Sequence, residues 1–190
     1  PVGDTPLVEA RLIKIPRAES AVGSVQAVHE MSVASKILAK VLAVNVKAGQ
    51  QVKKGDVLVQ LDDADLRAKR QQAAAAVDAA RAARDQAKIE HARVSSLFEQ
   101  NSAARIELDR VITALKSAEA DLERAEQALK EAETVLGYAT VQAPTDGVVV
   151  DKRVEAGDTV VPGQVLVNLY DPKRMQLVAS VRESLTHRLK

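Results

Sequence analysis

The sequence predicts an α+β fold in which a small β-unit, made of two similar halves, is interrupted by a long helical hairpin. Two observations carry this prediction. Valine-rich segments with glycine turns flank a middle region that has no Gly between residues 55 and 137 and no Pro between residues 16 and 144. Because Gly and Pro are the strongest helix breakers, the middle region is expected to be helical. The flanking segments are typical of short strands joined by turns.

The second observation is an internal repeat in the flanking segments. Residues 46–61 and 154–169 align without a gap at a constant offset of 108 positions, with glycines and apolar residues at matching places. One such pattern fits any ordinary hairpin, but two copies in register predict halves that pack on each other. We expect residues 34–62 and 143–171 to form one β-sandwich. Its structural turns are expected at Gly49, Gly55, Gly147, Gly157 and Gly163.

The middle region predicts two helices of similar length. The first, over residues 63–98, begins with acidic residues near the positive end of the helix dipole. Its apolar residues recur every seven positions: Leu66, Ala73, Ala80, Ala87 and Val94. The second, over residues 104–136, carries a leucine column interleaved with Ala or Val, which is typical of a coiled-coil seam. That leucine column is Leu108, Leu115, Leu122, Leu129 and Leu136.

A short polar segment, Glu-Gln-Asn-Ser over residues 99–102, joins the two predicted helices. Asn and Ser suit a turn followed by a new N-cap. Two helices of similar length joined by a short turn are expected to fold back as an antiparallel coiled-coil hairpin, about 50 Å long. A parallel dimeric zipper formed by the second helix is the alternative, but it leaves the apolar column of the first helix without a partner.

Composition and charge narrow the possible functions. Aromatic residues make up only 2% of the chain, so a deep aromatic pocket is not expected. The net charge of +1 argues against a nucleic-acid partner, which usually requires a basic excess. The absence of cysteine excludes disulfides, a thiol nucleophile and a cysteine zinc site. No apolar run of about 18 residues is present, and we expect the chain to be a fragment or a processed product.

The sequence offers no arrangement that favours catalysis or a cofactor. His29, His91 and His187 are far apart, and nothing in the sequence forces metal ligands to converge. The acidic residues over 62–65 are interpreted as the start of a helix rather than as a cation site. No phosphate-binding loop or nucleophile motif is present. We therefore expect a protein that is not an enzyme and holds no cofactor.

The order of these parts resembles a known family. The two β-halves carry a G-x-x-V-x-x-G-x-V-L pattern and resemble the halves of a lipoyl or biotinyl domain. A hairpin inserted between them, followed by the phrase that begins at Tyr138, is similar to the periplasmic adaptors, or membrane fusion proteins, of the HlyD-like and acriflavine-pump type. The resemblance implies a lipoyl-like barrel-sandwich hybrid over 28–62 and 140–171, a helical hairpin over 63–139, and partial β-barrel strands over 1–27 and 172–190.

The resemblance also implies a function. Such adaptors link an inner-membrane transporter to an outer-membrane exit duct in tripartite efflux or secretion. An RND-type transporter, rather than an ABC-type one, and a TolC-like channel are the partners expected here. The resemblance implies a location in the periplasm, attachment to the inner membrane by an N-terminal anchor outside this chain, and self-association as a trimer or hexamer.

Two other functions compete with this interpretation. The first is a lipoyl- or biotinyl-type acyl carrier, which needs an exposed lysine at the tight turn between the halves. The nearest lysine, Lys69, falls inside the first predicted helix, which disfavours that function. The second is a self-associating coiled-coil scaffold.

The hairpin tip is the site that the resemblance assigns to the duct. Adaptors of acriflavine-type pumps carry an Arg, a Leu four residues on and a Ser seven beyond, and the matching residues here are Arg93, Leu97 and Ala104. Arg supplies a multi-donor cation and Leu an apolar knob, although Arg93 could also be an ordinary solvated charge. Ala104 either changes the tip geometry or packs in the helical seam. The predicted tip comprises Arg93, Leu97, Phe98, Gln100, Asn101, Ser102 and Ala104.

Overall fold

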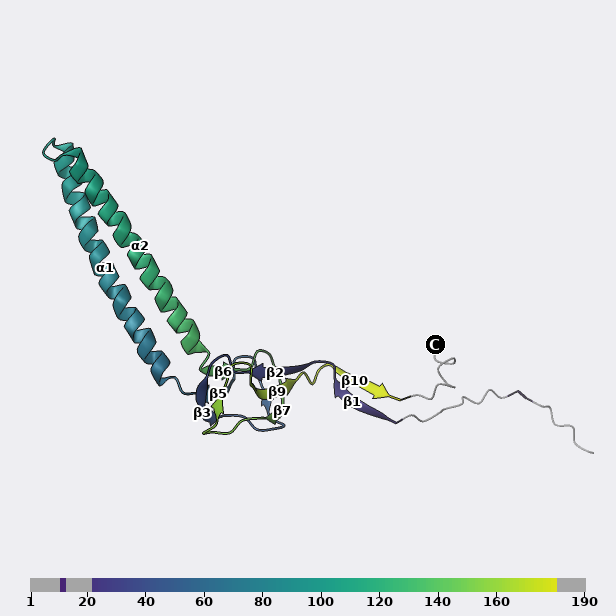
Figure 1. Cartoon of the computed structure of the whole chain (residues 1–190). Helices are drawn as coiled ribbons and strands as arrows, with labels where there is room; N and C mark the ends of the chain where they lie inside the picture. Colours follow the sequence, from purple (N-terminus) through teal and green to yellow (C-terminus); the bar gives the residue numbers. More distant parts are fainter. Residues whose placement is uncertain (1–10, 13–21, 181–190) are drawn as a thin grey trace, which may run out of the picture.

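The computed structural model describes residues 11–12 and 22–180 of the chain. Figure 1 shows three parts in a row: a long helical hairpin, a small β-sandwich and a two-stranded ribbon. Of the segments in which partial β-barrel strands are expected, residues 1–10, 13–21 and 181–190 lie outside the described residues. The predicted α+β class is therefore present, with the helices and the strands in separate parts of the molecule.

The described residues form ten strands and two helices. They are β1 (Gly23–Ala27), β2 (Glu30–Ala34), β3 (Ala39–Val44), β4 (Gln51–Val52), β5 (Val57–Leu61), α1 (Ala64–Glu99), α2 (Arg105–Gly137), β6 (Thr140–Gln142), β7 (Gly147–Lys152), β8 (Thr159–Val160), β9 (Val165–Tyr170) and β10 (Met175–Ala179).

The sandwich consists of two four-stranded sheets, in the orders β2-β9-β7-β4 and β6-β5-β3-β8. Every neighbouring pair in these sheets is antiparallel. Each sheet combines strands that precede the helices with strands that follow them. The two repeated segments are therefore intertwined in one unit, as their shared pattern predicts.

The offset of 108 positions holds in the structure beyond the repeated sequence. Strands β3 and β4 map onto β7 and β8 at this offset, and β5 maps onto β9. The backbone hydrogen bonds also come in matched pairs: Gly49 N–H donates to Val149 O, and Gly157 N–H donates to Val41 O, each at 2.8 Å. A second matched pair is Gly55 N–H to Ala143 O at 2.9 Å and Gly163 N–H to Ser35 O at 2.8 Å. The sandwich therefore has an approximate two-fold symmetry that exchanges its halves.

The core of the sandwich is aliphatic and draws on both halves. Leu58 and Leu166 occupy matching positions and are both fully buried. Close packing of such side chains away from water is the main favourable term in folding. The other fully buried large side chains are Leu61, Leu169, Val41, Val59, Val149, Val160 and Val167.

Four of the five predicted turn glycines have a left-handed backbone, a conformation that residues with a Cβ rarely adopt. Their φ values are +82° at Gly49, +94° at Gly55, +103° at Gly157 and +86° at Gly163. Gly147 differs, because it is the first residue of strand β7 rather than part of a turn. Its requirement is space, since a Cβ at this position would lie 2.8 Å from the carbonyl oxygen of Tyr170.

The helical hairpin follows the predicted bounds to within one residue at each end. Helices α1 and α2 run side by side in opposite directions (Figure 1), and Arg70 on α1 contacts Glu133 on α2 at 3.1 Å. The predicted apolar columns of both helices are buried or half-buried in the seam between them. A second column on α1, which is not among the predicted columns, includes the buried Val77 and the half-buried Arg84 and His91.

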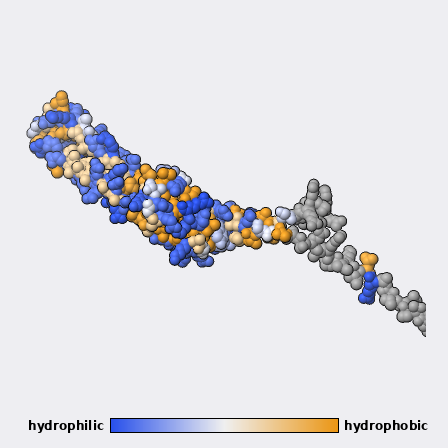
Figure 2. All heavy atoms as spheres, turned by 60° about the horizontal axis from the view of Figure 1, so that its bottom comes forward, coloured by the Kyte–Doolittle hydropathy of each residue, from blue (hydrophilic) through white to orange (hydrophobic). Residues whose placement is uncertain are grey.

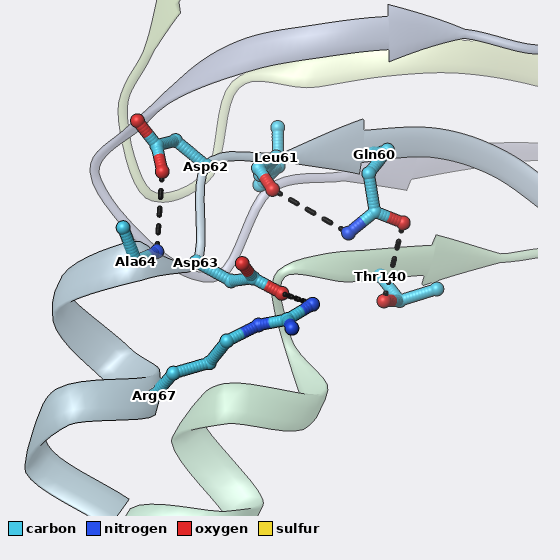
Figure 3. A network of polar contacts seen from close by, with 7 residues as sticks. All are labelled: Gln60, Leu61, Asp62, Asp63, Ala64, Arg67 and Thr140. Carbon is cyan, nitrogen blue, oxygen red and sulfur yellow. Dashed lines mark hydrogen bonds and ion pairs between the residues drawn. The ribbon is translucent and has the colours of Figure 1, made fainter.

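Figure 3 shows the polar contacts at the base of the hairpin, where β5 leads into α1 and α2 leads into β6. The hydroxyl of Thr140 donates to Gln60 at 3.4 Å, which joins β6 to β5. Asp62 accepts a hydrogen bond from Ala64 N–H at 3.1 Å, and Asp63 forms an ion pair with Arg67 at 2.9 Å. This ion pair raises the pKa of Arg67 above its ordinary value, first through its hydrogen bond and then through the opposite charge. The acidic residues thus serve the helix start, as predicted.

Strands β1 and β10 pair as an antiparallel ribbon that extends the sandwich at the end away from the hairpin. Apolar side chains remain exposed on it, including Val25, Leu177 and Val178. Figure 2 shows these strands as a largely orange, hydrophobic surface. Within the described residues, neither helix has an apolar stretch long enough to cross a membrane.

Candidate interaction surface at the hairpin tip

The tip begins where α1 ends, at a left-handed turn on Asn101. Asn101 has a φ of 57°, and its N–H donates to Phe98 O at 2.9 Å. The next N–H, that of Ser102, donates to Leu97 O at 2.8 Å. This bond pattern is the Schellman motif, in which Asn is a common substitute for Gly. The conformation of Asn101 therefore satisfies the last carbonyls of α1 and reverses the chain.

Helix α2 begins at Arg105, and its N-cap residue, Ala104, provides no side-chain cap. The expectation that Asn or Ser would cap α2 is wrong, because Asn101 is used to end α1, and the hydroxyl of Ser102 donates to Gln100 O at 3.3 Å. Ala104 is also exposed, so it does not pack in the seam. The residue half-buried at this level is its neighbour Ala103. A Ser at position 104 would stand where a helix N-cap is needed.

Arg93 lies one turn before Leu97, with a side chain that is 66% exposed. Its guanidinium forms a forked ion pair with Glu90 on the same helix, with contacts of 2.6 and 2.8 Å from Nη2 to the two carboxylate oxygens. Glu90 raises the pKa of Arg93, first by hydrogen bonding and then by its charge, and Glu107 adds a smaller contribution. The tip residues predicted from the sequence do not include Glu90, although the three-residue spacing between Glu90 and Arg93 is typical of an ion pair on one helix.

The apolar part of the tip consists of Leu97 and two neighbours of different exposure. Leu97 is 39% exposed, and Phe98 is half-buried. Ile106, in the first turn of α2, is 80% exposed and was not among the predicted tip residues. Ile106 faces away from the seam. This orientation follows from the residue at which α2 starts, because the start determines the direction in which each side chain of the helix points. Figure 2 shows a hydrophobic group at the outer end of the hairpin.

The remaining predicted tip residues are polar and solvent-exposed. Gln100 donates to the hydroxyl of Ser96 at 3.2 Å, and Asn101 and Ser102 are exposed in the connection. The structure thus brings all seven predicted residues to one end of the hairpin, where they form a small surface with apolar and cationic groups. Such a surface can contact another protein. Among the described residues, no three His, Asp or Glu side chains lie close enough together to hold a metal ion.

Residues 29–171 match the family described as the RND MFP, barrel-sandwich hybrid domain, where MFP denotes membrane fusion protein. The match covers more than half of the chain and includes both halves of the sandwich and the hairpin. The chain therefore belongs to the RND membrane fusion protein family.

Curated relatives are similar over most of the chain. The chain is 30% identical over 177 residues to the multidrug resistance protein MdtA of Cronobacter turicensis, covering 92% of this chain and 43% of that protein. It is 28% identical over 162 residues to MdtA of Proteus mirabilis, covering 83% of this chain and 39% of that protein. The chain thus spans less than half the length of these relatives.

Solved structures have the same fold. MacA from Actinobacillus actinomycetemcomitans superposes with a TM-score of 0.64 at 27% identity, covering 90% of this chain and 58% of MacA. A MacA–MexA chimera that contains the α-hairpin domain of Pseudomonas aeruginosa MexA gives a TM-score of 0.68 at 26% identity, covering 90% of this chain and 57% of the chimera. These similarities cover the sandwich together with its hairpin.

Proposed function

We propose that this chain is the central part of a periplasmic adaptor that joins an inner-membrane transporter to an outer-membrane exit duct in tripartite efflux. Membership in the RND membrane fusion protein family supports this function and favours an RND-type over an ABC-type transporter. The relatives named as multidrug resistance proteins support efflux as the process served. The role is mechanical, and the proposal includes no catalytic step.

The observation that carries the proposal is the position of the tip. Helix α1 has 36 residues, so the hairpin holds Arg93 and Leu97 about 45–50 Å from the sandwich. A rigid pair of helices that presents an apolar and a cationic side chain at its far end is suited to contact a partner at a distance. We propose that the partner is a TolC-like outer-membrane channel, whose helical end would accept Leu97 in an apolar groove and Arg93 beside carbonyl or carboxylate oxygens.

The ion pair between Arg93 and Glu90 adds a condition to this docking. Because Glu90 already engages the guanidinium, the channel must either accept the pair as a unit or replace the Glu90 carboxylate. Exchange is feasible because the pair is exposed, and exposed ion pairs contribute little to stability.

The rest of the proposed assembly involves segments outside the described residues. We propose that the ribbon of β1 and β10 is one part of a β-barrel, whose other strands cover its exposed apolar side chains. An N-terminal anchor would hold the protein to the inner membrane, and several copies, as a trimer or hexamer, would surround the exit path. The acyl-carrier alternative is disfavoured, because Lys69 lies within α1 and the tight turn that a carrier needs is replaced by the hairpin.

The test uses the full-length protein with Leu97→Asp or Arg93→Ala at the tip. Export of a pump substrate and cross-linking to the outer-membrane channel are both measured. We expect Leu97→Asp to reduce cross-linking about tenfold or more, because burial of a leucine contributes about 1.5–3 kcal/mol. Arg93→Ala should have a smaller effect in the same direction.

The matched control is Arg124→Ala. Arg124 also forms an ion pair with an acidic residue three positions before it, Asp121, and its side chain is 76% exposed, but it lies toward the base of the hairpin. It should leave export and cross-linking unchanged. Normal export and cross-linking in both tip variants, with helicity retained, would remove the tip from the binding surface.

A further inference from the structure

Helix α2 carries an apolar side chain and an arginine one turn apart, close to the tip. Ile106 is 80% exposed, and Arg110 is exposed as well. Because they are four positions apart on a helix, their side chains lie on neighbouring turns of one face. Both line a shallow, open depression that continues along α2 over small side chains such as Ala114 and Ser117. Helix α2 thus presents a surface that combines one apolar and one cationic group.

This surface lies level with the Leu97 surface of α1. The contact between Arg70 and Glu133 fixes which levels of the two helices correspond. As many residues separate Leu97 from Arg70 on α1 as separate Ile106 from Glu133 on α2, and both helices rise by about 1.5 Å per residue. The arginines of the two surfaces are level for the same reason, because each lies four positions from its apolar neighbour, toward the base. The tip therefore carries two pairs of the same composition, one on each helix.

The two arginines differ in what already binds them. Arg93 is held by Glu90, three positions nearer the base, in a forked ion pair. The corresponding position on α2 is Thr113, which has no charge and whose hydroxyl donates to Asp109 O at 2.9 Å. Within the part of the chain that the structure describes, Arg110 forms no ion pair. Its guanidinium donors therefore remain available to another protein.

We propose that Ile106 and Arg110 form a second contact with the outer-membrane channel, in which a channel helix places an apolar side chain against Ile106 and a carboxylate against Arg110. The complementary charge and the position beside the Arg93–Leu97 pair on the same tip support this partner. A carboxylate can accept two parallel hydrogen bonds from a guanidinium that has no other partner. This inference rests on the proposed function and adds a second point of contact to it.

The second contact also determines which channel is accepted. A channel helix that covers Arg110 without offering a carboxylate would leave a guanidinium buried and unpaired, which is costly. The Arg93 guanidinium brings its own carboxylate in Glu90, so it discriminates less between channels with and without an acidic residue. Arg110 is thus the residue that selects the partner by charge.

The test places a photo-cross-linking amino acid at Gln100 of the full-length protein in cells, which leaves both pairs intact. Capture of the channel and export of a pump substrate are measured. We expect Ile106→Asp to reduce capture about tenfold, whereas Ile106→Leu should preserve it. Neither change should unfold α2, because Ile106 is exposed and an acidic residue is favourable in the first turn of a helix. Circular dichroism verifies that helicity is retained.

The charge of the second contact is tested separately. Arg110→Glu should reduce capture about tenfold or more, and Arg110→Ala should reduce it more than Arg93→Ala does. Lys130→Glu is the matched control and should leave capture unchanged. Lys130 is also an exposed cation on α2 without an ion pair among the described residues, but it lies about 30 Å nearer the base.

A charge exchange identifies the partner of Arg110. Mass spectrometry of the captured channel peptide shows which acidic residues lie near the cross-link. Replacing one of them by Lys should restore capture and export by the Arg110→Glu protein. If none of these replacements restores capture, the ion pair with the channel is refuted.

Unchanged capture and export in both Ile106→Asp and Arg110→Glu would overturn the second contact. If the unaltered α2 and these variants all allow capture from position 100 equally, only this inference fails, and the proposed function stands. If position 100 captures no channel even with α2 unaltered, while export continues, the docking function of the tip fails and this inference fails with it.

Discussion

The two ends of the sandwich are built alike but carry different extensions. At one end, Leu61 N–H donates to Ala139 O at 2.8 Å, where the chain leaves for α1 and returns from α2. At the other end, Met31 pairs with Leu169, where the chain enters from β1 and continues to β10. Residues 31 and 61 map onto 139 and 169 at the repeat offset, so the two exits are equivalent. The sandwich thus carries a helical hairpin at one exit and a β-ribbon at the equivalent exit. The hairpin and the ribbon, rather than the sandwich, therefore determine what each end can contact.

Side chains near the two exits show how far the equivalence extends. The hydrogen bond from Thr140 to Gln60 near the hairpin is repeated near the ribbon by Ser32 and Asn168, at 3.4 Å and 2.8 Å respectively. Asn168 also donates to Asp151 at 2.8 Å, whereas the position matching Asp151 in the first half is an alanine. The side-chain hydrogen bond across paired strands therefore occurs at both ends of the sandwich. The additional hydrogen bond occurs only at the ribbon end.

The largest expected effect tests the equivalence of the halves in the core. Leu58→Ala and Leu166→Ala should each lower the free energy of unfolding by about 2–5 kcal/mol, because both remove a fully buried leucine from matching sites. Urea denaturation of the two variants measures this. A large effect at one position and almost none at the other would show that the halves are not energetically equivalent.

A smaller effect separates the halves at a position where they differ. Gly147→Ala should cost about 1–3 kcal/mol, because its Cβ would lie 2.8 Å from Tyr170 O and strand β7 must shift. The matching residue in the first half is Ala39, which already has a Cβ. Gly137→Ala is the control, since nothing lies within 4 Å of a Cβ there. Equal thermal stability of both alanine variants would refute the crowding at Gly147.

The turn glycines should respond to backbone conformation rather than to space. Gly157→Val should cost more than about 1 kcal/mol, because φ is +103° although no atom lies within 4 Å of the added Cβ. The matching Gly49→Val, at a φ of +82°, should behave alike. Gly157→Asn should cost less, since Asn tolerates positive φ better. If Val and Asn are equally well tolerated in chemical denaturation, the turn is not strained.

The smallest effect concerns the tip. Ala104→Ser should stabilise α2 by about 0.5–1 kcal/mol, because position 104 is an N-cap without a side-chain acceptor. Hydrogen exchange of the first amides of α2 should slow in this variant. Ser102→Ala is the control and should leave these amides unchanged, because its hydroxyl serves the connection rather than α2. Unchanged exchange in Ala104→Ser would mean that position 104 does not cap α2.

The sequence predicts the regular parts of this fold well, for identifiable reasons. The seven-residue spacing of Leu108 to Leu136 and the lack of Gly and Pro determine the two helices, whose bounds agree to within one residue. The repeat around Gly49 and Gly157 predicts strands that share both sheets. The repeated pattern stops short of β2 and β6, although these strands also correspond at the same offset, with Ser32 matching Thr140 and Val33 matching Val141.

The hairpin tip is harder to predict from the sequence than the helices and strands are, because residues there suit more than one structural role. Asn101 suits either an N-cap or a left-handed helix end, and only the hydrogen bonds of the turn show that it ends α1. The sequence does not indicate the column containing Arg84 and His91, because these polar residues interrupt its apolar pattern. The exposure of Ile89 and Ile106 follows from helix phase and not from residue type.

The role of the hairpin tip is tested most directly by a photo-cross-linking amino acid placed at Leu97 of the full-length protein in cells. The same group at Gln127, an exposed residue toward the base of α2, is the reference position. We predict that the Leu97 site captures an outer-membrane channel protein and that the Gln127 site does not. Capture of the channel from Gln127 but not from Leu97, or capture from neither site while export continues, would contradict the role assigned to the hairpin tip.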